Sequence, residues 1–172
     1  MHVPPVPVTV IYRKIRLLLV FFICALVISG LTAIPLETEL KTLTGFLSSA
    51  QTAHPSVLAR WLLKIQEGLI QTNTNYPFVA YGTDLLAFAH LVIAVAFIGA
   101  YRDPVRNAWV IEFGMIACAM VIIFPFVMGP IRQIPFGWRL IDASFGLFGL
   151  IPLWLCRRYI QQLSHKTEPA SV

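Results

Sequence analysis

The sequence predicts an all-α protein, a four-helix transmembrane bundle with an extracytoplasmic amphipathic helix between the first and second spans. Only 12% of its 172 residues are charged, about half the 25% typical of soluble domains. Its apolar residues gather in four long blocks, and basic residues stand at the block ends. Blocks of this length cross about 30 Å of hydrocarbon. We therefore expect one polytopic membrane domain over residues 1–172.

The first span is expected over about residues 15–35. A basic stretch containing Arg13, Lys14 and Arg16 precedes the apolar residues 17–34. A basic start before an apolar run also describes a cleaved signal peptide. The run is longer than the usual signal-peptide core of about 7–15 residues, which favours an uncleaved anchor over cleavage.

The polar segment after the first span has the pattern of an amphipathic helix over about residues 56–71. Its apolar residues recur at helical spacing, at Leu58, Trp61, Leu62, Ile65 and Leu69. Its polar residues fall on the opposite face, at Arg60, Lys64, Glu67 and Gln71. Such a helix lies on the membrane surface or covers the exposed ends of the spans. Leucines at positions 36, 40 and 43 indicate another short helical piece before it.

The second span is expected over about residues 78–101. One of its faces carries small or polar residues, namely Ala80, Thr83, Ala87, His90 and Ala94. A stripe of this kind lets neighbouring transmembrane helices approach closely. We expect the other spans to pack around it.

The third and fourth spans are expected over about residues 108–128 and 138–156. A tight turn containing Pro104 precedes the third span, and a hairpin rich in proline and glycine joins it to the fourth. Small residues recur every third position in the fourth span, at Ala143, Gly146 and Gly149. They predict a second close-packing face.

The distribution of basic residues predicts the orientation. Eight Lys and Arg residues fall on the side of the termini and five on the other side. Because cytoplasmic loops carry the excess of positive charge, we expect a multi-pass protein of a bacterial inner (plasma) membrane with both termini in the cytoplasm. The same placement explains the net charge of +5 without a nucleic-acid partner.

Four ionisable residues near the outer ends of the spans form the first candidate site. They are Asp84 in the second span, Arg132 in the hairpin, and Arg139 and Asp142 in the fourth span. One interpretation is a polar pocket in which Arg132 and Arg139 bind an anionic or carbonyl-bearing ligand and Asp84 or Asp142 handles a proton. The other is an ion-pair network that fixes helix register, because Arg139 and Asp142 are three residues apart.

His90, near the middle of the second span, is the second candidate. Its leading interpretation is a hydrogen bond to a neighbouring helix. Haem b needs a second axial ligand, for which the sequence offers only Met120 at a similar depth. A quinone needs an apolar slot and one or two polar partners, which His90 with Thr83 or Asp84 would supply. Cys118 gives no metal-binding spacing with His90, so we expect no metal site.

Glu112, near the inner end of the third span, is the third candidate. A salt bridge to Arg106 or Arg157 is its simplest role. A proton relay from Glu112 through His90 to Asp84 is the alternative, because the three residues differ in depth.

The sequence carries no nucleotide-binding, hydrolase or metalloprotease motif, so we expect no enzyme. The leading hypothesis is a structural or accessory subunit of a larger membrane assembly, whose partners are lipid and other subunits or a second copy. The alternatives are a redox or ligand-binding protein, with quinone favoured over haem b, and a proton-coupled transporter built as an oligomer. The substrate, the partner and the oligomeric state stay open.

Overall fold

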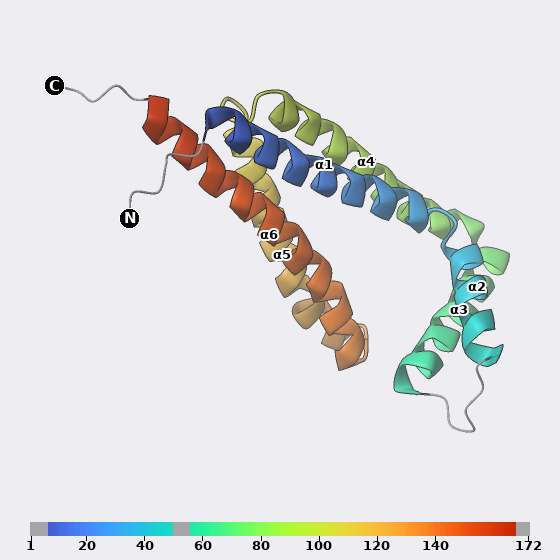
Figure 1. Ribbon diagram of the computed structural model, residues 1–172. Helices are drawn as coiled ribbons and strands as arrows, with labels where there is room; N and C mark the ends of the chain where they lie inside the picture. The colour runs from blue at the N-terminus through green and yellow to red at the C-terminus, as the bar shows by residue number, and fades with distance from the viewer. Residues whose placement is uncertain (1–6, 50–55, 168–172) are drawn as a thin grey trace.

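The structure is a computed structural model that describes residues 7–49 and 56–167 (Figure 1). These residues form helices and no strands. The α-helices are α1 (Val8–Ala33), α2 (Leu36–Ser49), α3 (Val57–Asn75), α4 (Ala80–Arg102), α5 (Ala108–Ile131) and α6 (Phe136–Thr167), and a 3₁₀ turn, η1 (Pro77–Val79), precedes α4. Helices α1, α4, α5 and α6 are long and apolar enough to span a membrane. The predicted all-α class with four candidate spans is confirmed.

Two of the helices are longer than the sequence predicts. Helix α1 begins at Val8 rather than near residue 15, and α6 continues to Thr167 rather than ending near residue 156. In these extensions Ile11 and Ile160 are buried, with exposed fractions of 1% and 2%, in one shared core. The basic residues therefore mark the end of each apolar block, while packing between α1 and α6 carries the helices further.

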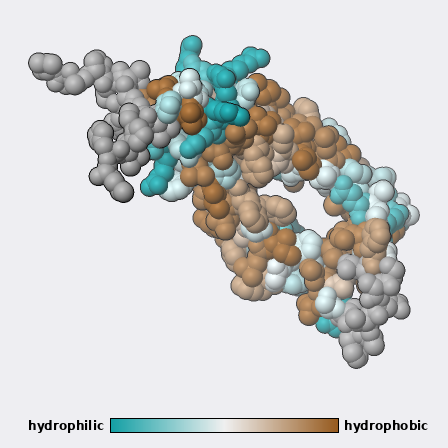
Figure 2. Space-filling view, in the orientation of Figure 1, coloured by the Kyte–Doolittle hydropathy of each residue, from teal (hydrophilic) through white to brown (hydrophobic). Residues whose placement is uncertain are grey.

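The four long helices form two arms. Helix α1 packs along α4, and α5 packs along α6 in the most extensive contact of the described chain. The arms meet where α1 begins and α6 ends, which we call the terminal end, and they diverge toward the distal end (Figure 1). We call the space between them the opening; Figure 2 shows it as a gap. The prediction that all spans pack around the second one is wrong, because only α1 follows α4 along its length.

A shared core holds the arms together at the terminal end. Phe97 of α4 is fully buried, and its ring lies 4.7 Å from the ring of Phe22 in α1, centroid to centroid. Gly114 of α5 makes room for Phe97, since a Cβ atom there would lie 2.5 Å from the Phe97 Cζ atom. Leu153 of α6 completes this core. All four long helices therefore meet around Phe97.

The α5–α6 arm is closely packed at its glycines. A Cβ atom at Gly146 would lie 2.5 Å from the carbonyl oxygen of Cys118, and one at Gly149 would lie 2.8 Å from the Cys118 Sγ atom. Ala143, one turn before Gly146, is also buried. The close-packing face predicted from these small residues is confirmed.

Helices α2 and α3 form a hairpin at the distal end of the α1–α4 arm (Figure 1). Leu40 and Leu62 are buried in it. The amide of Asn73 donates a hydrogen bond to Glu37 at 2.7 Å, and Lys41 pairs with the same carboxylate at 2.6 Å. Helix α3 corresponds to the amphipathic helix expected over about 56–71; its side of the membrane stays a prediction.

The Glu37 contacts give this hairpin a pH dependence. The hydrogen bonds from Lys41 and then Asn73 hold the pKa of Glu37 below its usual value of 4.5. The ionised carboxylate therefore stabilises the hairpin above that value, and the stabilisation is lost as pH falls through the lower folded-state pKa. We expect faster amide hydrogen exchange in α2 and α3 only in acid, after correction for intrinsic rates. Glu37→Gln should remove this acid step, and an unchanged step in the variant would contradict the assignment.

Candidate functional site

One face of α4 turns from the core to the opening along its length. Residues three and four apart form this stripe, namely Thr83, Leu86, His90, Ile93, Phe97 and Ala100. Phe97 and Ala100 are fully buried, and Ile93 packs against the same core. Leu86, seven residues before Ile93, is 61% exposed. Because residues seven apart share a helix face, the distal half of the stripe faces the opening.

His90 lies on this distal half, seven residues before Phe97, at its border with α1, because a Cβ atom at Gly30 of α1 would lie 3.3 Å from the His90 Cβ atom. Its Nδ1 atom is 2.8 Å from the carbonyl oxygen of Leu86, one turn earlier in the same helix. The carbonyl can only accept, so Nδ1 is the donor in this bond, and Nε2 can accept a hydrogen bond whenever it carries no proton. The predicted hydrogen bond to a neighbouring helix is not formed among the described residues, because Nδ1 is bonded to the backbone of α4 itself. Nε2 has no protein partner among the residues that the structure describes.

Asp142 of α6 lies on the α5–α6 arm at about the same distance from the shared core as His90 on the α1–α4 arm. It lies seven residues before Gly149, whose Cβ position would be 3.2 Å from the Phe22 ring of α1. Gly149 lies closer still to α5, where its Cβ position would be 2.8 Å from the Cys118 Sγ atom, so Asp142 continues the edge of α6 between its contacts with α5 and α1. At 1.5 Å per residue, both Asp142 and His90 lie about 10 Å from the core toward the distal end. Asp142 is partly buried, and it makes no hydrogen bond or ion pair within residues 7–49 and 56–167.

The other members of the predicted outer cluster are separated. Arg139 donates from Nε to the carbonyl oxygen of Ile134 at 2.7 Å, so the predicted pair with Asp142 is not formed. Arg132 is exposed at the end of α5. Asp84 is exposed on α4, which belongs to the other arm (Figure 1). The structure thus does not gather these residues around one pocket, and their roles in ligand binding and proton handling stay predictions.

Glu112 pairs with Arg157, joining α5 to α6 near the terminal end at 2.7 Å. The predicted salt bridge is confirmed with this partner. The structure records no contact that links Glu112 to His90 or Asp84 within its described residues, and the proton relay stays a prediction.

This pair should contribute little to stability. The Arg157 and Glu112 side chains are 33% and 48% exposed, and exposed pairs contribute only about 0.2–1 kcal/mol. We expect a double-mutant cycle of Glu112→Gln and Arg157→Gln, measured by unfolding in one detergent, to give a coupling energy in that range. A coupling well above it would mean that the pair is shielded from solvent.

Met120, the predicted second haem ligand, is not turned toward His90. Met120 is 65% exposed, and it lies six residues after Gly114, the α5 residue that faces α4 at Phe97. Six residues correspond to about 120° around a helix, so Met120 is turned away from that face. In the described chain, no three His, Cys, Asp or Glu residues are grouped in a way that could hold a metal ion.

His90 and Asp142 stand out in the sequence as candidate site residues, but their positions relative to the core do not. The available signal was the spacing of Leu86, His90, Ile93 and Phe97, which is the three-and-four repeat of helices that interlock. The stripe of small residues overlaps this repeat at Thr83 and His90, and its Ala87 packs on Gly30 of α1.

No known protein family, curated protein or solved structure matches the chain.

Proposed function

We propose that this protein is an integral membrane protein that serves as a structural or accessory subunit of a membrane assembly. In this proposal a transmembrane helix of another subunit, either a second copy or a different protein, packs into the opening. One observation carries it. The interlocking stripe of α4 is buried around Phe97, borders α1 at His90 and becomes exposed toward Leu86, which is 61% exposed.

A helix fits this stripe better than lipid does. Residues spaced three and four apart form ridges that fit the grooves of another helix. Acyl chains also lack hydrogen-bonding groups, so they leave Nε2 of His90 and the carboxyl group of Asp142 without partners. Ionisable groups inside membrane spans usually face other protein segments and pair there. A helix that brings a polar side chain to this depth would satisfy both.

The charge distribution supports the orientation within a bacterial inner membrane. Figure 2 shows hydrophilic surface gathered at the terminal end. Exposed basic residues stand there, among them Arg13, Lys14, Arg16, Arg102, Arg106 and Arg158. By the positive-inside rule this end faces the cytoplasm, so both termini are cytoplasmic. The α2–α3 hairpin then lies on the extracytoplasmic side.

Native mass spectrometry of protein released from its own membranes tests this proposal. We expect the chain to appear in a complex of defined stoichiometry. Leu86→Ala should reduce the complexed fraction, because Leu86 lies on the bare half of the stripe. Phe88→Ala is the matched control, since Phe88 is also 61% exposed but lies on the opposite side of α4. A wild-type chain that appears only as a monomer with lipid would overturn the proposal.

A quinone or similar amphiphile is the second candidate for the opening. Nε2 of His90 can accept a hydrogen bond from a quinol hydroxyl, and Asp142 provides a polar group on the other arm. Organic extraction of the purified protein should then yield quinone in stoichiometric amount, and His90→Leu should lose it. Proton-coupled transport by an oligomer stays a third hypothesis, which predicts pH-dependent flux that Asp84→Asn abolishes.

A further inference from the structure

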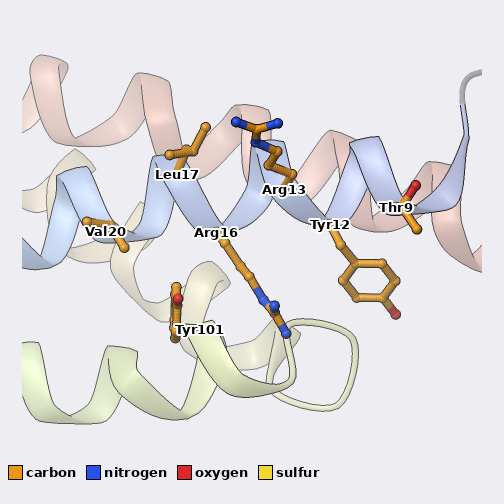
Figure 3. A pocket seen from close by; sticks show the side chains of 7 residues that line it. All are labelled: Thr9, Tyr12, Arg13, Arg16, Leu17, Val20 and Tyr101. Atoms are coloured by element: carbon orange, nitrogen blue, oxygen red, sulfur yellow. The ribbon is translucent and has the colours of Figure 1, made fainter.

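A pocket of about 600 Å³ lies at the terminal end, between α1 and α4 (Figure 3). It is lined by Thr9, Tyr12, Arg13, Arg16, Leu17 and Val20 of α1 and by Tyr101 of α4. Its volume falls within the range of about 300–1,000 Å³ usual for small-molecule sites. None of these residues takes part in the opening, so the pocket is a separate feature.

The lining changes from charged to apolar along α1. Arg13 and Arg16 are near the terminal end, while Leu17 and Val20 lie deeper in the apolar block and are 62% and 42% exposed. Val20 is about 10 Å beyond Arg13 at 1.5 Å per residue. The pocket therefore offers cations at headgroup depth and exposed aliphatic side chains at the depth of acyl chains.

The two arginines of the pocket have no ion-pair partner in the described part of the chain. Neither Arg13 nor Arg16 has a carboxylate within ion-pair distance among the described residues; the two ion pairs found there involve Glu37 and Glu112. The guanidinium carbon of Arg16 lies 5.6 Å from the centre of the Tyr101 ring. This cation–π contact holds Arg16 between the helices while leaving its N–H donors available.

Figure 3 shows how the side chains are arranged around the site. Arg16 extends from α1 past Tyr101 toward the loop that joins α4 and α5, and Tyr12 lies on the same side of α1. Arg13 projects from the other side of that turn. A guanidinium binds phosphate oxygens through two parallel N–H bonds. Arg16 is thus the central donor, with Arg13 at the rim.

We infer that this pocket binds the phosphate group of an anionic phospholipid, with an acyl chain lying along Leu17 and Val20. Charge complementarity selects the phosphate, and the apolar half favours a lipid over a soluble phosphate compound. Basic pockets between transmembrane helices on the cytoplasmic side are suited to anionic headgroups. The inference requires the four spans to cross the membrane, but it is independent of what fills the opening.

The test is retention of phosphatidylglycerol, measured by native mass spectrometry on protein reconstituted in phosphatidylcholine nanodiscs with added phosphatidylglycerol. We expect selective retention by the wild type. Arg16→Ala should weaken it about tenfold, which corresponds to about 1.4 kcal/mol. Arg158→Ala is the matched control, because Arg158 is also exposed, stands at the same end and lies 4.2 Å from the centre of the Trp154 ring, but does not line the pocket.

Each outcome decides between explanations. Equal losses in Arg16→Ala and Arg158→Ala would show general surface charge and would overturn the site, as would unchanged retention in Arg16→Ala. Displacement of the lipid by inorganic phosphate alone would assign the pocket to a soluble ligand instead. Tyr101→Leu is a second variant, in case Arg16→Ala does not fold, and it should also lower retention because it frees Arg16 from its position.

Discussion

Gly146→Ala should lower the free energy of unfolding by about 1–3 kcal/mol, the usual range for overpacked cores, and Gly146→Leu by more. The added Cβ atom would lie 2.5 Å from the backbone carbonyl oxygen of Cys118. Backbone in the middle of a packed helix cannot move aside as a side chain can. The two helices of the α5–α6 arm must therefore separate along their most extensive contact.

Two glycines provide controls for this prediction. A Cβ atom at Gly82 of α4 or Gly137 of α6 would have no neighbour within 4 Å. Gly82→Ala should be neutral or stabilising by up to about 1 kcal/mol, because alanine favours the helix. Gly137→Ala should likewise cause no steric conflict. Unfolding in one detergent, followed by the helical circular dichroism signal, compares Gly146→Ala with Gly82→Ala and Gly137→Ala. Equal stability of Gly146→Ala and wild type would contradict the close approach of α5 and α6.

Phe97→Ala should be the most damaging substitution in the core at the terminal end. Phe97 is fully buried and joins all four long helices around one ring. Phenylalanine-to-alanine changes in buried cores cost about 3–5 kcal/mol. We expect the low end, about 3 kcal/mol, because separated helices keep the ring in an apolar lipid or detergent environment. Phe88→Ala, at an exposed position of the same helix, should have little effect on the same unfolding curve.

A double substitution sharpens the Phe97 prediction. Gly114→Ala should destabilise the wild type, since its Cβ atom would lie 2.5 Å from Phe97 Cζ and 2.8 Å from Leu153 Cδ1. In the Phe97→Ala background one of these two conflicts disappears, so the cost of Gly114→Ala should fall. Additive effects of the two substitutions would mean that Phe97 and Gly114 are not in contact.

The parts of the fold that depend on local pattern could be predicted from the sequence. The apolar blocks locate four helices, and the small residues around Gly146 identify the face that packs on α5. The pairing of Glu112 with a basic residue also follows from their depths. The helix ends at Val8 and Thr167 could not be predicted from the apolar pattern, because a charged residue ends the hydrocarbon segment without ending the helix.

The opening could not be predicted, for a physical reason. Periodicity shows that Leu86, His90 and Phe97 share one side of α4, but not which helix lies opposite them. Arg139 illustrates the same limit on a smaller scale. Its spacing permits a pair with Asp142, yet the turn before α6, where Gln133 has a φ of 56°, places the Ile134 carbonyl within its reach. Both outcomes depend on tertiary geometry.

Photo-crosslinking inside intact membranes tests most directly whether another helix fills the opening. Benzoylphenylalanine would replace Leu86 in one variant and Phe88 in another, so that the same probe faces the opening or the opposite side of α4. The proposal predicts that position 86 crosslinks to one defined transmembrane segment, mapped by peptide mass spectrometry and confirmed from a probe placed in that segment, while position 88 labels lipid. Lipid labelling alone from both positions would contradict it.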